Sequence, residues 1–305
     1  LYKTSLVVIP EQNDPLRIPF SEIQEIIEGD YDLSVITEDG LRVIFSMMGF
    51  NLDPFKQSLR EAMGELDQGT RALITGMLPA VSPQEISLVA HLFRDGQAAS
   101  RSEIESVSPV FWNELERAIS CSPIAEEYAY LKSLARQDKI CIGVKKGLMG
   151  ELTGRYIWCL FPMYSLDLTQ PGNALAMESF SSTENGGGKA TYFFRLVSRK
   201  DYPGSVDLDA LHQEADIFIR QINRCLLAIN FRREPIYLSE EKLAEPLYIK
   251  YRYALARLPS LRELRARFIG RVSHTTPEQW RRDVDNLLKF NVSSRSDLEQ
   301  WSKGQ

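Results

Sequence analysis

An Asp-Gly pair between two alternating apolar runs is the feature that most constrains how this chain folds. Apolar and polar residues alternate over residues 31–35, ahead of Asp39-Gly40, and again over residues 41–47. This period of two is typical of strands with one buried face. Asp-Gly favours a type I′ turn, in which both central residues take positive φ. The sequence therefore predicts an antiparallel hairpin with a two-residue turn at Asp39-Gly40.

A helix is predicted directly after this hairpin. Asp53 is the expected N-cap, and Pro54 suits the first helical position. Short apolar runs over residues 5–9 and 16–20 precede the hairpin and predict further strands. Residues 1–69 are thus expected to form a sheet closed by one helix, whose apolar stripe is Phe55, Leu59, Ala62, Met63 and Leu66.

The next segment, residues 70–138, is predicted to be a helical connector. Ser82 to Glu85 reads as a capping box with Pro83 at the first helical position. Ser108-Pro109 predicts a second helix start. The pair of helices around residues 94–109 suggests a helix-turn-helix, but Glu114 and Glu116 give the second helix the wrong charge for contact with DNA phosphates.

The second half repeats the opening plan on a larger scale. Strands are predicted over residues 140–144, 156–164, 174–180 and 191–198, followed by an amphipathic helix over residues 208–229. Such a helix buries its stripe on the nearest sheet. We therefore expect an α+β protein, with two antiparallel-sheet units each closed by an amphipathic helix and helical segments between and after them. The expected parts are residues 1–69, 70–138, 139–235 and a basic helical tail over 236–305.

Strands, an Asp-Gly hairpin and a closing helix resemble a pleckstrin-homology-like domain. Residues 5–66 look like its last strands and helix, and residues 139–230 look like a second, looser copy. The resemblance implies a seven-stranded bent sheet closed by a C-terminal helix, whereas the second copy offers four strand candidates. It also implies a phosphoinositide site in a basic run between the first strands, a place that Lys145 and Lys146 match.

Cysteines and histidines limit the chemistry that the chain can perform. The four cysteines, Cys121, Cys141, Cys159 and Cys225, show no metal-ligand spacing and are expected to be buried thiols. A Cys141–Cys159 disulfide between neighbouring strands is the alternative. The three histidines, His91, His212 and His274, stand apart from one another and from any catalytic motif. We predict no metal, no cofactor and no catalytic residue, and leave open a Cys/His dyad assembled by folding.

Residues 186–188 are three glycines followed by Lys189. A Gly-Lys pair also ends a phosphate-binding loop. The P-loop also needs an earlier Gly, where Thr183 stands here, and a Ser or Thr after the Lys, where Ala190 stands. The segment that follows has a strand pattern, while the P-loop leads into a helix. The sequence therefore predicts a hairpin tip between two strands.

Charge is distributed unevenly along the chain. Residues 1–140 carry 22 acidic and 12 basic residues, a net charge of −10, and residues 141–305 carry a net charge of +5. Tyr248, Tyr251 and Tyr253 interleave with the basic residues. Arginine with aromatic residues serves nucleic acid or an acidic protein surface, and the alternative is that the two halves face each other within the chain or across a dimer. The basic segment comprises Lys250, Arg252, Arg257, Arg262, Arg265, Arg267 and Arg271.

These observations favour a non-catalytic protein-interaction or scaffold protein that uses this basic segment. The first alternative is an anion-binding module for phospholipid head groups or RNA, using Lys145, Lys146 and the same arginines. The second is an enzyme whose carboxylates converge only on folding. No apolar run approaches the roughly 20 residues of a membrane span, and no secretory start is present, so we expect a soluble, cytoplasmic protein. Oligomeric state stays open, as does whether residues precede Leu1.

Overall fold

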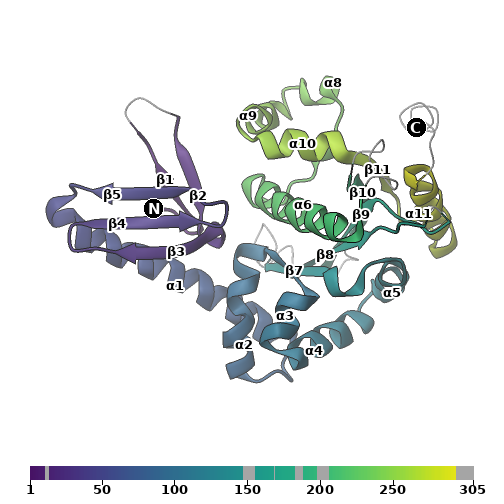
Figure 1. The fold of residues 1–305 in the computed structure, drawn as a ribbon, viewed down its shortest axis with the longest axis horizontal. Coiled ribbons are helices and arrows are strands. Elements are labelled where there is room, and N and C mark those ends of the chain that lie inside the picture. The colour runs from purple at the N-terminus through teal and green to yellow at the C-terminus, as the bar shows by residue number, and fades with distance from the viewer. Residues whose placement is uncertain (11–13, 147–154, 168, 183–187, 198–205, 293–305) are drawn as a thin grey trace. The chain divides into compact units, whose positions relative to one another are not determined.

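The computed structural model describes residues 1–10, 14–146, 155–167, 169–182, 188–197 and 206–292. Antiparallel sheets and helices make an α+β protein, as predicted. The chain divides into two compact units, Leu1–Gln97 and Ala98–Gln305 (Figure 1). Within the described ranges, no helix is both long and apolar enough to span a bilayer.

The first unit places one long helix on two small antiparallel sheets. Leu33 and Val35 of the central strand and Leu59 of the helix are almost fully buried, and they share one core with Phe20. Figure 1 shows α1 running along the three-stranded sheet. The sheets are β1 (Ser5–Val8) with β2 (Leu16–Pro19), and β3 (Ile23–Glu28), β4 (Asp32–Thr37) and β5 (Arg42–Ser46); the helices are α1 (Leu52–Met77) and α2 (Pro83–Val89).

The predicted hairpin is confirmed, but its turn differs from the predicted type. Gly40 has a φ of 82°, whereas Asp39 is not in the positive-φ region. The Gly40 N–H donates to the Thr37 carbonyl oxygen at 2.9 Å, and the Thr37 N–H donates to the Leu41 carbonyl oxygen at 2.9 Å. These bonds define a type I turn followed by one left-handed residue. The type I′ prediction was wrong because only Gly40 needs positive φ here.

The start and end of α1 also correct the sequence prediction. Asn51, not Asp53, occupies the N-cap, since a 3₁₀ turn over Gly49–Asn51 leads the chain into the helix. Asp53 lies in the first turn instead. The helix continues to Met77, past Leu66, the last residue of its predicted apolar stripe. The segment expected as one helical connector is therefore shared, with α2 in the first unit and three helices in the second.

The second unit is built on a six-stranded antiparallel meander in the order β11-β10-β9-β8-β7-β6. Its four central strands match the predicted ones. The two outer strands were missed, because β6 is a three-residue Ala-Ala-Ser segment and β11 follows directly on a basic helix. The strands are β6 (Ala98–Ser100), β7 (Cys141–Lys146), β8 (Arg155–Met163), β9 (Ala174–Ser182), β10 (Lys189–Arg195) and β11 (Phe268–Val272). The predicted glycine-rich tip lies mostly outside the described residues.

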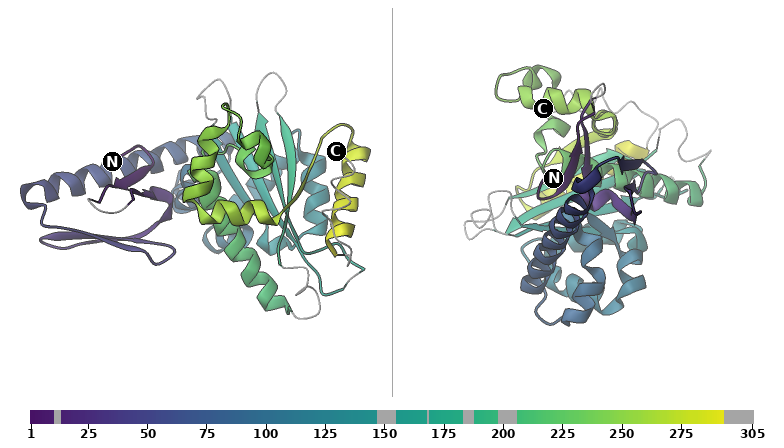
Figure 2. Two further views of the ribbon diagram at one scale, coloured as in Figure 1. Left: turned by 90° about the horizontal axis from the view of Figure 1, so that it is seen from above. Right: turned by 90° about the vertical axis from the view of Figure 1, so that its left-hand side faces the viewer.

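Helices cover both faces of this sheet (Figure 2). On one face, α6 (Leu208–Ala228) and α10 (Pro259–Arg267) pack on Trp158, Met177 and Phe194. On the other face, Tyr128 packs edge-on against Phe161 of β8 at 5.6 Å between ring centroids. The helices of this second face are α3 (Arg101–Val107), α4 (Pro109–Ser120), α5 (Ala125–Leu134) and α11 (Pro277–Val292). Capping by Ser82 and Ser108 is confirmed. Ser239 and Thr276 cap helices as well.

The strand register excludes the disulfide alternative. Cys141 lies opposite Leu160 and Cys159 lies opposite Ile142, so the two sulfur atoms point to opposite faces of the sheet. All four cysteines are free thiols. Cys121 is exposed, contrary to the expectation that all four are buried.

Candidate functional site

A buried carboxylate on the sheet is the starting point of the candidate site. Glu178 of β9 lies directly opposite Thr191 of β10, on the face away from α6. Glu178 is 1% exposed and Thr191 is fully buried. A carboxylate at such a position costs free energy unless hydrogen bonds or charges compensate it. The side chains around Glu178 therefore determine whether the cost of burying this carboxylate is compensated.

His274, in the loop between β11 and α11, provides that compensation. Its Nε2 lies 2.9 Å from Thr191 Oγ1 and 3.3 Å from Glu178 Oε2. Its Nδ1 lies 3.3 Å from Glu127 Oε1, on α5. The imidazole thus bridges two carboxylates, one on each side of the ring.

Four further contacts complete the arrangement. Trp280 Nε1 donates to Thr191 Oγ1 at 2.9 Å and its ring stacks on His274, while the Thr191 hydroxyl donates to Glu178 Oε2. Lys189 Nζ donates to Glu127 Oε1 at 2.6 Å. We call this set the buried charge network; it comprises Glu127, Glu178, Lys189, Thr191, His274 and Trp280.

Burial and the contacts within the network determine the pKa, and so the charge, of its titratable residues. Burial by itself lowers the pKa of His274, but hydrogen bonds to Glu127 and Glu178 and the charges of both outweigh it and raise the pKa to about 9. Burial raises the pKa of Glu127, but hydrogen bonds from His274 and Lys189 bring it down to about 2. Burial dominates at Glu178 and raises its pKa. His274 is therefore a cation at neutral pH.

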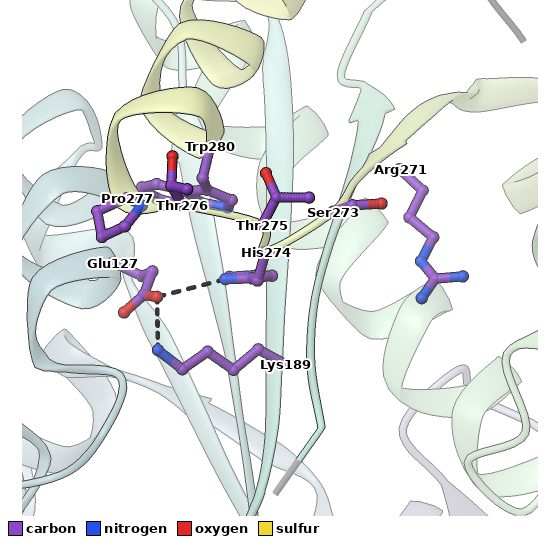
Figure 3. A pocket seen from close by; sticks show the side chains of 9 residues that line it. All are labelled: Glu127, Lys189, Arg271, Ser273, His274, Thr275, Thr276, Pro277 and Trp280. Carbon is purple, nitrogen blue, oxygen red and sulfur yellow. Dashed lines mark hydrogen bonds and ion pairs between the residues drawn. The ribbon is translucent and has the colours of Figure 1, made fainter. Parts of the chain in front are cut away.

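A pocket of about 390 Å³ opens above the network, at the N-terminus of α11. Figure 3 shows Lys189 and His274 converging on Glu127, while Arg271 extends to the opposite side. The lining carries three cationic side chains and one carboxylate, in addition to exposed hydroxyl groups. The lining residues are Glu127, Lys189, Arg271, Ser273, His274, Thr275, Thr276, Pro277 and Trp280.

Thr191, His274 and Glu127 are connected in the order of the nucleophile, base and acid of a catalytic triad. The contacts of these three residues argue against catalysis by such a triad. Thr191 is fully buried, so no substrate reaches its hydroxyl, which already donates to Glu178. His274 carries two protons at neutral pH, since its pKa is about 9, and so cannot accept another. Within the described part of the chain, no cluster of three or more metal-ligating side chains occurs.

Three arginines of the predicted basic segment are engaged inside the second unit. Arg262 donates to the Leu255 carbonyl oxygen at 2.8 Å. Arg265 donates to the Pro235 carbonyl oxygen at 2.7 Å and pairs with Glu240. Arg267 donates to the Leu196 carbonyl oxygen and pairs with Glu263 and Glu214. The structure gives these three guanidinium groups partners within the fold.

The other predicted site residues lie in three places. Arg271 lines the pocket and stacks on Tyr192 and Tyr237, its guanidinium carbon lying 5.9 and 5.6 Å from their ring centroids. Lys145 lies 4.4 Å from the centroid of Phe231, and Lys146 ends β7. Helix α9 (Ile249–Arg257) carries Lys250, Arg252 and Arg257.

Sequence reasoning missed Glu127, Glu178 and Thr191. One signal was available, because Glu178 directly follows four apolar residues, Ala174 to Met177, and so marks a charge on a strand that is expected to be buried. Thr276 caps the helix start beside the pocket, since its Oγ1 accepts from the Gln279 N–H at 3.2 Å. Comparison with known proteins finds no family model that matches the chain, and no curated protein or solved structure with significant similarity to it.

Proposed function

We propose that the second unit binds a ligand through an anionic group, a phosphate or a carboxylate, without transforming it. The observation that carries this proposal is the charge of the pocket, where Lys189, Arg271 and protonated His274 face one carboxylate. The N-terminus of the 16-residue helix α11 adds a positive dipole end. A volume of about 390 Å³ falls within the range of small-molecule sites.

The cationic groups have separate roles in this proposal. His274 contributes charge from below, since both ring nitrogens already contact carboxylates. Lys189 keeps donors beyond the one that it gives to Glu127. Arg271 is exposed and offers a planar guanidinium held against two tyrosine rings, which suits a two-point contact with an oxyanion.

Substitution of Arg271 tests this function. Pyrophosphate and citrate serve as probes in isothermal titration calorimetry at constant ionic strength. We expect Arg271→Ala to weaken binding about tenfold or more, since a charge-assisted hydrogen bond contributes about 1.5–3 kcal/mol. Arg252→Ala, an exposed arginine on α9, is the matched control and should leave affinity unchanged. Absence of binding by the native chain, or equal effects of both substitutions, would contradict the proposal.

The interaction role predicted from the sequence is a second proposal. Exposed large apolar side chains in both units favour it, with Phe50 and Met47 fully exposed and Leu247 70% exposed. Large apolar side chains left exposed are a feature of protein-interaction surfaces. This role does not depend on the pocket.

A further inference from the structure

Three large side chains project from one end of the first unit. Asp32 lies opposite Ser46 in the sheet, so the turn between β3 and β4 adjoins the segment that leaves β5. Tyr31 in that turn is 86% exposed, and Met47 and Phe50 in the segment are fully exposed. Exposed side chains of this size next to one another indicate a surface that binds something.

The backbone holds this surface in place. Lys56 of α1 donates to the Gly29 carbonyl oxygen at 2.6 Å and ties the β3–β4 turn to the helix. The Asn51 N–H donates to the Met48 carbonyl oxygen at 3.1 Å. Met47 takes a φ of 58°, which is strained for a residue with a side chain. The strained backbone thus presents the Met47 side chain to solvent, and no burial of that side chain within the unit compensates for the strain.

The surroundings of these side chains are acidic. Asp30, Asp32 and Asp53 are exposed there. The nearby cations are engaged, because Lys56 is buried and Arg60 pairs with Glu28. We call the six residues Asp30, Tyr31, Asp32, Met47, Phe50 and Asp53 the acidic apolar surface. Its charge favours a cationic partner over an anionic bilayer.

Helix α9 of the second unit presents the complementary chemistry. Ile249, Arg252 and Tyr253 have helical spacing i, i+3 and i+4, so they share one side of the helix. Ile249 is 58% and Tyr253 is 66% exposed, and Arg252 is exposed with them. Leu247 and Lys250 adjoin this side. Among the described residues, no carboxylate pairs with Arg252 or Lys250. We call Leu247, Ile249, Lys250, Arg252 and Tyr253 the basic apolar face.

We infer that the acidic apolar surface of one copy of the chain binds the basic apolar face of a second copy. Each surface combines exposed large apolar groups with one sign of charge, and the two signs are opposite. Because the two surfaces differ, the contact is head-to-tail and leaves each end of a pair free for another copy. Association then continues beyond the dimer, into a closed ring or an open chain.

Two variants of the full chain test this inference by sedimentation velocity. Met47→Ser/Phe50→Ser removes the apolar groups of the first surface, and Arg252→Glu/Tyr253→Ser reverses the charge of the second. The native chain is expected to grow in mass with concentration, and growth should weaken at high salt. Each variant alone should remain monomeric. An equimolar mixture of the two should form a one-to-one dimer and nothing larger, because it contains one intact pair of surfaces.

The matched control is Leu88→Ser/Val110→Ser, which removes exposed apolar side chains outside both surfaces and should associate like the native chain. Circular dichroism checks that every variant is folded. A native chain that stays monomeric at all concentrations would overturn the inference; this includes the case in which the surfaces bind a membrane or a different protein. A mixture of the two variants that remains monomeric would overturn it as well, as would either variant associating like the native chain.

Discussion

His274 meets a different carboxylate at each ring nitrogen, and this arrangement determines its charge. A histidine with one carboxylate neighbour gains a partner for one N–H group, whereas two neighbours favour the doubly protonated ring. The distances of 3.3 Å to Glu127 and to Glu178 satisfy both sides. The His274 cation is therefore a fixed part of the pocket floor. Its removal should lower the free energy of unfolding by a measurable amount.

Stability should report this charge through its pH dependence. The folded pKa of about 9 exceeds the ordinary 6.5, so the stabilisation is complete below pH 6.5 and is lost as pH rises through 9. Its full size is about 3 kcal/mol, from about 1.4 kcal/mol per pKa unit. Urea denaturation at pH 6 and pH 9.5 should show that His274→Gln costs much more free energy of unfolding at pH 6.

The exposed histidine provides the control for this measurement. His91→Gln should leave the free energy of unfolding unchanged at both pH values. A cost of His274→Gln that is the same at pH 6 and pH 9.5 would contradict the charge assigned to His274.

Two glycines of the first unit have equal space around them but opposite backbone requirements. An added Cβ meets nothing within 4 Å at Gly40 or at Gly64. Gly40 has a φ of 82° in the β4–β5 turn, whereas Gly64 lies inside α1. Substitution of each glycine by alanine therefore measures how the backbone conformation at that position alone affects stability.

We expect the two alanine substitutions to change stability in opposite directions. Gly40→Ala should lower the free energy of unfolding by about 1–2 kcal/mol, because a side chain is strained at positive φ. Gly64→Ala should raise it by about 0.5–1 kcal/mol, because alanine loses less backbone entropy in a helix. Denaturation curves monitored by circular dichroism measure both. Two changes of the same sign would contradict the turn geometry described here.

The elements that could be predicted from sequence are those with a long local period. The hairpin around Gly40, helix α6 and the four central strands of the second sheet follow from alternation or helical spacing within each segment. Strands β6 and β11 did not, because a three-residue strand has no period and β11 depends on pairing with β10. The site was missed for the same reason, since Glu127, Glu178 and His274 meet only through tertiary contacts.

At the scale of the whole molecule, each unit has its own apolar core. Leu59, 1% exposed, packs in the core of the first unit, and Leu226, fully buried, packs in that of the second. The pocket is lined by residues of the second unit alone. Separate cores predict that damage to one unit remains local and that ligand binding follows the second unit.

A matched pair of core substitutions, read by hydrogen exchange, tests this independence. Leu59→Ala and Leu226→Ala each delete three buried carbon atoms and should each cost about 2–5 kcal/mol. We expect Leu59→Ala to accelerate amide exchange in residues 1–97 while pyrophosphate affinity stays unchanged. Leu226→Ala should accelerate exchange in the second unit and, near its unfolding temperature, reduce binding. If either substitution accelerated exchange equally throughout the chain, the two units would unfold as one cooperative structure, because local opening is confined to the part whose contacts are lost.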